Sequence, residues 1–142
     1  MIDKHASAHW EGSLKEGKGH ISTESGALDR THYSFTKRFE DSKGTNPEEL
    51  IGAAHSGCFS MALSMILGEE GLTPDAIDTM STITLDKVDG NFTVTKAHLK
   101  VDAKIPDASE QQFQKCANTA KDNCPISKLL NAEITIEAKL AN

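Results

Sequence analysis

The chain has 142 residues, a length that suits one domain with a single core. With 37% hydrophobic and 25% charged residues it is typical of a soluble globular protein on the polar side, which often completes its core by dimerising. The formal net charge of -6 argues against a nucleic-acid-binding protein, because the phosphate backbone selects for clustered Lys and Arg.

Residues 6–40 alternate polar and apolar side chains between turn glycines, a pattern that predicts three antiparallel strands. The clearest predicted strand is Tyr33–Phe39. Its period of two places Tyr33, Phe35 and Phe39 on one face and Ser34, Thr36 and Arg38 on the other. The segment has few aliphatic residues, so we expect residues 1–45 to pack on a partner chain or to be exchanged with it.

A long helix is predicted to begin at Asn46-Pro47 and to end near Gly71. Its uncharged run, Leu50–Gly68, is long enough to span a membrane. The run contains His55 and three serines and has glutamate pairs at both ends, so we interpret it as a buried helix of a soluble protein, with no membrane partner.

Small residues recur every four positions along this helix, which places them in one stripe. The stripe predicts that a second helix, from this chain or a partner, packs closely against it. Its members are Gly52, Ser56, Ser60, Ser64 and Gly68.

The remaining chain predicts two strands over 77–88 and 91–105, joined by a turn at Asp89-Gly90-Asn91. Ser109 and Gln112 form a capping pattern for a helix over 109–121. A short helix follows from Cys124-Pro125 to about residue 130, and a last strand covers 132–140. This order predicts one α+β domain over residues 1–142 with an antiparallel-rich sheet.

Cys58 is the candidate nucleophile, although a cysteine within a helix is most often a small core residue. A free thiol is only a few per cent thiolate at neutral pH, and apolar burial lowers that fraction. The anion therefore needs either a helix break at Gly57 or a nearby cation. Arg38 is the candidate cation, and Glu48, on the same side of the helix as Cys58, is the candidate partner that holds it.

Cys124 has the better local activation, because it comes directly before Pro125 at a predicted helix start. Residue chemistry alone therefore leaves open which thiol attacks first. Cys116 has no evident activator and is interpreted as structural. His55, three residues before Cys58, is either a packed histidine or the base of a Cys–His acyl-transfer enzyme. The sequence contains no evident oxyanion-hole motif, which disfavours acyl transfer.

Two cysteine motifs carry a resemblance to a known family. The segment Thr45–Leu63 (TNPEELIGAAHSGCFSMAL) resembles the signature helix of the family of osmotically inducible protein C and the organic hydroperoxide resistance proteins. Residues 123–127 (NCPIS) resemble its second cysteine motif. Residues 9–12 (HWEG) and 22–26 (STESG) resemble the osmotically inducible branch, so the resemblance extends over nearly the whole chain.

The resemblance implies an α+β fold whose antiparallel-rich sheets wrap around central cysteine-bearing helices in an intertwined two-fold homodimer. It also implies a peroxidase that reduces organic hydroperoxides with an external dithiol as reductant and with no metal, haem or flavin. Carried onto this chain, Cys58 is the peroxidatic thiol and Cys124 the resolving thiol, and they must approach closely enough to form a disulfide. Arg38 stabilises the thiolate, from its own or the partner subunit, and Glu48 orients Arg38.

An apolar lining by Phe39, Phe59, Met61 and His55 would favour alkyl or lipid hydroperoxides. The alternative function is an apolar-ligand binding or carrier protein whose cysteines are structural or oxidation-sensitive. Juxtaposition of Cys58 with Cys124 discriminates between the two, because a binding protein has no use for it. The N-terminus lacks the apolar core of a signal peptide, and three cysteines without CxxC spacing disfavour a secreted disulfide framework or a zinc ribbon, so we expect a cytoplasmic protein.

Overall fold

The computed structural model describes residues 1–36 and 43–142 of the chain. They form two compact units, Met1–Pro47 and Glu48–Asn142, and each is described by itself. Two residues singled out in the sequence, Arg38 and Phe39, lie outside the described residues.

The N-terminal unit is an antiparallel sheet of three strands in the order β1 (Ala6–Glu11), β2 (Lys18–Thr23) and β3 (Thr31–Tyr33). The Trp10 and Tyr33 rings pack against one another, with centroids 5.5 Å apart, at the position where β2 has Gly19 between them. Among the described residues of this unit only Gly19 and Thr45 are buried. The unit therefore has little core of its own, as its composition indicates.

The predicted strand Tyr33–Phe39 is wrong in its extent, since β3 ends at Tyr33 and residues 34–36 are not strand. Tyr33 pairs with Gly19, and β2 begins one residue earlier, at Lys18. The neighbouring strand begins at Lys18, so the ladder between β2 and β3 does not extend past the position opposite it. Residues 37–39 of the predicted strand lie outside the described residues.

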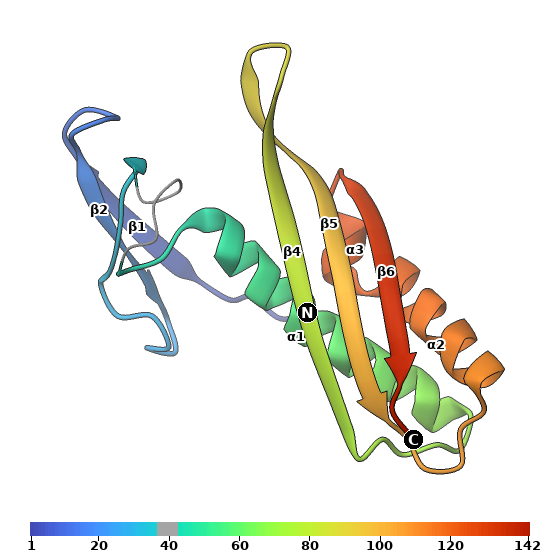
Figure 1. Cartoon of the computed structure of the whole chain (residues 1–142). Coiled ribbons are helices and arrows are strands. Elements are labelled where there is room, and N and C mark those ends of the chain that lie inside the picture. The colour runs from blue at the N-terminus through green and yellow to red at the C-terminus, as the bar shows by residue number, and fades with distance from the viewer. Residues whose placement is uncertain (37–42) are drawn as a thin grey trace. The chain divides into compact units, whose positions relative to one another are not determined.

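The C-terminal unit combines a second three-stranded sheet with helices (Figure 1). Its elements are α1 (Pro47–Glu69), β4 (Ala76–Val88), β5 (Asn91–Lys104), α2 (Glu110–Asn123), α3 (Pro125–Leu129) and β6 (Glu133–Leu140). β4 and β5 form the predicted hairpin, and β6 adds to β5 in parallel. The Ser109 hydroxyl accepts a hydrogen bond from the Gln112 N–H at 3.1 Å, which confirms the predicted cap of α2. The α+β class predicted from the order of elements is confirmed.

One face of this sheet is covered by α1 and α2 (Figure 1). Inward-facing side chains alternate with exposed ones along β5, as expected for a sheet buried on one side. They meet one side of α1 and the apolar side of α2. The centre of this core contains Phe59, Leu63, Leu67, Leu99, Val101, Ile105 and Phe113.

The small-residue stripe of α1 faces a strand at two of its positions. A Cβ at Gly52 would lie 3.0 Å from the Ser81 carbonyl oxygen, and the Ser60 hydroxyl lies 2.8 Å from that of Thr79. Both partners belong to β4. The prediction that a helix packs there is wrong at Gly52 and Ser60, because the edge strand of the sheet occupies that side of α1.

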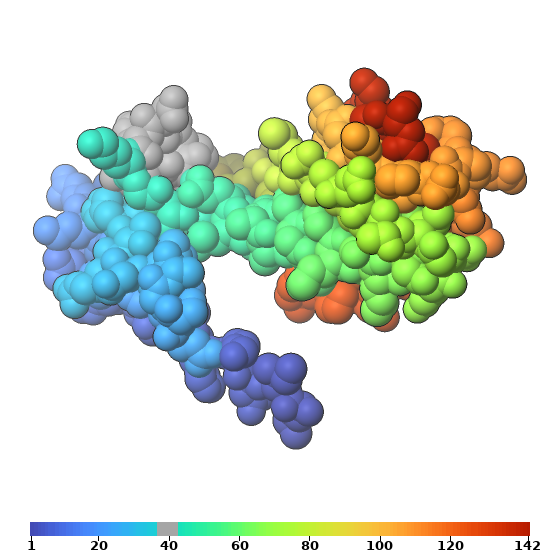
Figure 2. Space-filling view, turned by 90° about the horizontal axis from the view of Figure 1, so that it is seen from below, coloured from blue at the N-terminus to red at the C-terminus, as the bar shows by residue number. Residues whose placement is uncertain are grey.

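By length and composition alone, α1 is apolar enough to cross a membrane. One side of it packs into the core through Phe59, Leu63 and Leu67, as expected for a core helix. The side that carries Ala53, Gly57, Met61 and Met65 is exposed in the single chain, and Figure 2 shows part of the surface of α1 uncovered.

Candidate active site

The fold brings Cys58 and Cys124 together, although they are far apart in the sequence. Cys58 lies in the middle of α1, and Cys124 lies at the junction between α2 and α3. They are close enough for the Cys124 side chain to raise the pKa of Cys58 as a hydrogen-bond partner, and both are free thiols. Cys58 is half-buried, whereas Cys124 is completely buried.

The immediate surroundings of Cys58 favour its neutral form. Burial raises the pKa of the Cys58 thiol, the hydrogen bond with Cys124 raises it further, and a hydrogen bond from the Ile126 N–H to the sulfur partly offsets both. Within the part of the chain that the structure describes, none of these influences comes from Lys or Arg. A thiolate at neutral pH therefore requires a cation from elsewhere.

The sequence predicts that the N-terminus of α3 stabilises the Cys124 thiolate, but in the structure the first turn of α3 contacts Cys58. Cys124 is its N-cap residue, but the Cys124 side chain makes no capping hydrogen bond. Instead the backbone N–H of Ile126, in the first turn of α3, donates to Cys58. α1 runs unbroken from Pro47 to Glu69, so the alternative of a helix break at Gly57 is wrong. Any help from a helix N-terminus thus reaches Cys58 from α3.

His55 is completely buried, and both of its ring nitrogens have partners. Nδ1 lies 3.0 Å from the Ser81 hydroxyl oxygen on β4, and Nε2 lies 2.8 Å from the Ser127 hydroxyl oxygen on α3. Burial lowers the pKa of His55, which keeps the imidazole neutral. Of the two alternatives predicted from the sequence, the structure supports a packed histidine. Both ring nitrogens are bonded to serines, so His55 does not pair with Cys58 as its base.

The partners of His55, Ser127 and Ser81, are not predicted by any motif in the sequence. The sequence does contain a spacing that points to Ser127. Cys58 follows His55 by three residues, and Ser127 follows Cys124 by three. Residues three apart share a helix face, so two thiols in contact bring the histidine and the serine together as well.

The other predicted site residues that the structure describes differ in burial and in the direction they face. Phe59 is completely buried in the core, whereas Met61 is 72% exposed; residues two apart on a helix point about 200° from each other. Glu48 is half-buried in the first turn of α1, and its pairing with Arg38 stays a prediction because Arg38 is outside the described residues. Cys116 is buried in the core on α2, where burial first and the charge of Glu70 second raise its pKa.

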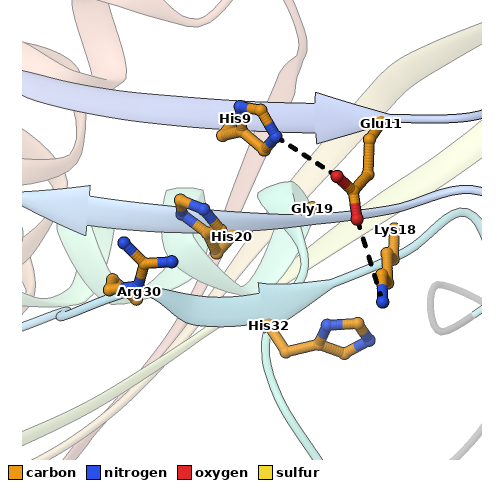
Figure 3. Close-up of a pocket in the computed structure, with 7 residues that line it drawn as sticks. All are labelled: His9, Glu11, Lys18, Gly19, His20, Arg30 and His32. Carbon is orange, nitrogen blue, oxygen red and sulfur yellow. Dashed lines mark ion pairs between the residues drawn. The ribbon is translucent and has the colours of Figure 1, made fainter.

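Two of the cavities that the described residues of the N-terminal unit form bear on function. One, of about 360 Å³, is polar and contains a row of three histidines, His9, His20 and His32, which pair directly across the three strands (Figure 3). The His9 and His20 rings are stacked, and Glu11 joins His9 and Lys18 at 3.7 and 3.8 Å. The other cavity, of about 320 Å³, is mainly apolar and is lined by Trp10, Leu14, Tyr33, Ser34, Phe35 and Pro47. Neither cavity contains a cysteine.

Comparisons with known proteins agree with this arrangement of elements. The chain is 53% identical over 139 residues to peroxiredoxin OsmC of Escherichia coli, and the aligned region covers 98% of this chain and 97% of that protein. It is 30% identical over 123 residues to the organic hydroperoxide resistance protein OhrB of Bacillus subtilis, covering 86% and 88% of the two chains. The crystal structure of OhrB matches with a TM-score of 0.72 at 26% identity over 95% of this chain and 98% of that one.

An OsmC-like protein of unknown function from Vibrio cholerae has the same fold, with a TM-score of 0.77 at 20% identity over 97% of this chain and 99% of that one. The family model described as OsmC-like protein matches residues 40–139, which include both cysteine motifs. The chain therefore belongs to the OsmC-like protein family.

Proposed function

We propose that this protein is a cysteine-based peroxidase that reduces organic hydroperoxides to alcohols through Cys58 and Cys124. The observation that carries the proposal is the hydrogen-bonded contact between these two thiols. The names of its relatives, a peroxiredoxin and an organic hydroperoxide resistance protein, support the same reaction and substrate class.

The difference in burial supports Cys58 as the thiol that attacks the peroxide. Cys58 is half-buried and can be reached from solvent, whereas Cys124 is completely buried behind it. A peroxide therefore meets Cys58 first. The proposal therefore gives the resolving role to Cys124.

The reaction follows from sulfur chemistry. The Cys58 thiolate attacks the distal peroxide oxygen, the O–O bond breaks, and the alkoxide takes up a proton and leaves as an alcohol, which oxidises Cys58 to a sulfenic acid. The Cys124 thiol then attacks the Cys58 sulfur, a disulfide forms, and the hydroxyl leaves with a proton as water. An external dithiol reduces the disulfide by exchange and is itself oxidised to a disulfide. We place this cycle in the cytoplasm, where reduced thiols are maintained.

The cation that Cys58 needs is assigned in this proposal to Arg38, oriented by Glu48, from the same or the partner subunit. Its support is the pKa of Cys58, which the described surroundings raise and the Ile126 N–H offsets only in part. Replacing Arg38 with Gln removes a positive charge, so we expect the pKa of Cys58 to rise and its reaction with iodoacetamide to move to higher pH. Peptide mass spectrometry after timed alkylation measures this profile at Cys58.

Arg30→Gln is the matched control, because Arg30 is an exposed arginine of the N-terminal unit. If the Arg38→Gln profile overlays that of the parent protein, Arg38 does not stabilise the thiolate.

The active form in this proposal is an intertwined homodimer with two-fold symmetry, in which the central cysteine-bearing helices contact one another. A helix that is hydrophobic on all sides needs cover on all sides, yet Ala53, Gly57, Met61 and Met65 of α1 are exposed in the single chain. The N-terminal unit also has little core of its own among its described residues, which supports its packing on a partner chain.

The decisive test is the disulfide. We expect one equivalent of cumene hydroperoxide, added to the reduced protein, to produce a Cys58–Cys124 disulfide within one chain, because the two thiols are already in contact. Peptide mapping by mass spectrometry under non-reducing conditions identifies the linkage. Unreacted thiols, or a linkage through Cys116 alone, would refute the peroxidase cycle.

The second candidate is an apolar-ligand binding or carrier protein. The observation that favours it is the mainly apolar cavity of about 320 Å³ in the N-terminal unit, which contains Trp10, Tyr33 and Phe35. This candidate predicts retention of an apolar ligand and peroxide consumption no faster than that of a free thiol, so the same experiment separates the two functions.

A further inference from the structure

The contact between the two thiols is one of two parallel contacts between α1 and the segment that begins α3. On α1, Cys58 follows His55 by three residues, and Ser127 follows Cys124 by three. Cys58 is hydrogen-bonded to Cys124, and His55 Nε2 lies 2.8 Å from the Ser127 hydroxyl oxygen. The second contact therefore lies one helical turn from the first and joins the same two elements.

The histidine in this second contact is itself anchored to the sheet. Its other nitrogen, Nδ1, lies 3.0 Å from the Ser81 hydroxyl oxygen on β4, and the ring is completely buried. Because a serine hydroxyl both donates and accepts, either tautomer of a neutral imidazole satisfies both bonds. The connection Ser81–His55–Ser127 thus runs from the sheet, through α1, to α3.

The position of the helix α3 depends on side-chain contacts with α1, such as the bond between Ser127 and His55. It covers only Pro125–Leu129, and a helix of so few residues is not stable by itself. Ile126 packs against the core, but Leu129 at the end of the helix is 74% exposed and anchors little. Ser127, in contrast, is buried and bonded to His55.

We propose that His55 and Ser127 are positioning residues for the resolving step: their hydrogen bond holds α3 so that Cys124 faces the Cys58 sulfur. This inference rests on the proposed peroxidase function. The step it serves is the attack of the Cys124 thiol on the Cys58 sulfenic acid, which forms the disulfide and releases water. The first step, attack of Cys58 on the peroxide, does not use Cys124, so this bond affects it only through the Ile126 N–H that donates to Cys58 from α3.

The test separates the two steps in a single turnover. Reduced protein is mixed with one equivalent of cumene hydroperoxide; dimedone trapping follows the Cys58 sulfenic acid, and non-reducing peptide mapping follows the disulfide. In Ser127→Ala we expect the formation of the disulfide to slow by about tenfold, as expected if Cys124 is aligned in about a tenth of the molecules. The oxidation of Cys58 should slow much less, because the Ile126 N–H is only one of the influences on the Cys58 pKa. A sulfenic acid that lives longer is further oxidised to sulfinic acid, so over-oxidation should rise as well.

Rescue and control variants distinguish positioning from general damage. Ser127→Thr keeps a hydroxyl and should restore the rate of disulfide formation. His55→Phe keeps a ring but has no donor or acceptor, so it breaks the same contact from the α1 side and should slow disulfide formation. Ser60→Ala removes a hydroxyl bond of 2.8 Å between α1 and β4, and His98→Phe removes one of 2.6 Å between β5 and β6. Both controls should form the disulfide at the parent rate.

Two results would overturn the inference: an unchanged rate of disulfide formation in Ser127→Ala and His55→Phe, or an equal loss in Ser60→Ala and His98→Phe. Failure of the proposed function is recognised separately, since the parent protein itself would then form no Cys58–Cys124 disulfide.

Discussion

Replacing Cys58 with Ser is expected to abolish peroxide reduction, leaving only the uncatalysed reaction of the buffer. A serine hydroxyl at this position cannot form a sulfenic acid or a disulfide, and neither Cys124 nor Cys116 is exposed enough to replace it. Consumption of cumene hydroperoxide with excess dithiothreitol measures the rate. The variant should keep its fold, because Cys58 is only half-buried and serine is of similar size.

Cys124→Ser should behave differently and serves as the matched variant. Cys58 still attacks the peroxide, so one equivalent per chain is consumed rapidly, and turnover then slows to the rate at which external thiol reduces the sulfenic acid directly. Cys116→Ser should keep parental turnover, since its thiol is buried on α2 as part of the core. Parental turnover in Cys58→Ser would exclude the proposed function, and equal behaviour of Cys58→Ser and Cys124→Ser would contradict the division of roles.

Met61→Lys is expected to weaken the proposed homodimer by about a hundredfold or more. Met61 is 72% exposed in the single chain and lies on the side of α1 that the partner is proposed to cover. Burial of an unpaired ammonium there costs several kcal/mol, and each ~1.4 kcal/mol is a factor of ten in the dissociation constant. Sedimentation velocity over a dilution series measures this constant.

The control for this substitution is Met80→Lys. Met80 is 65% exposed, and it lies on β4 between Thr79 and Ser81, which face α1, so its side chain points to the opposite side of the sheet. It should leave the association unchanged. A parent protein that sediments as a monomer at all concentrations, or equal effects of the two substitutions, would argue against the interface on α1.

Local signals in the sequence were sufficient for most of the secondary structure. Pro47 at the start of α1, the Ser109 cap of α2 and the Asp89-Gly90-Asn91 turn between β4 and β5 each act within a few residues, so they can be interpreted without the fold. The strand predicted over Tyr33–Phe39 was wrong in its extent, because the end of a strand is not a local property. Its alternation is local, but the length of a strand depends on the neighbour it pairs with, and β2 begins at Lys18.

The sequence by itself also determined the candidate thiols and, through the two cysteine motifs, the family. Only the tertiary structure decided how the residues meet: the contact of Cys58 with Cys124, the donation of the Ile126 N–H to Cys58, and the connection of His55 to Ser81 and Ser127. These contacts join α1, β4 and α3, which are distant along the chain. Their geometry is set by how the helices pack on the sheet, and the types of the residues involved do not specify it.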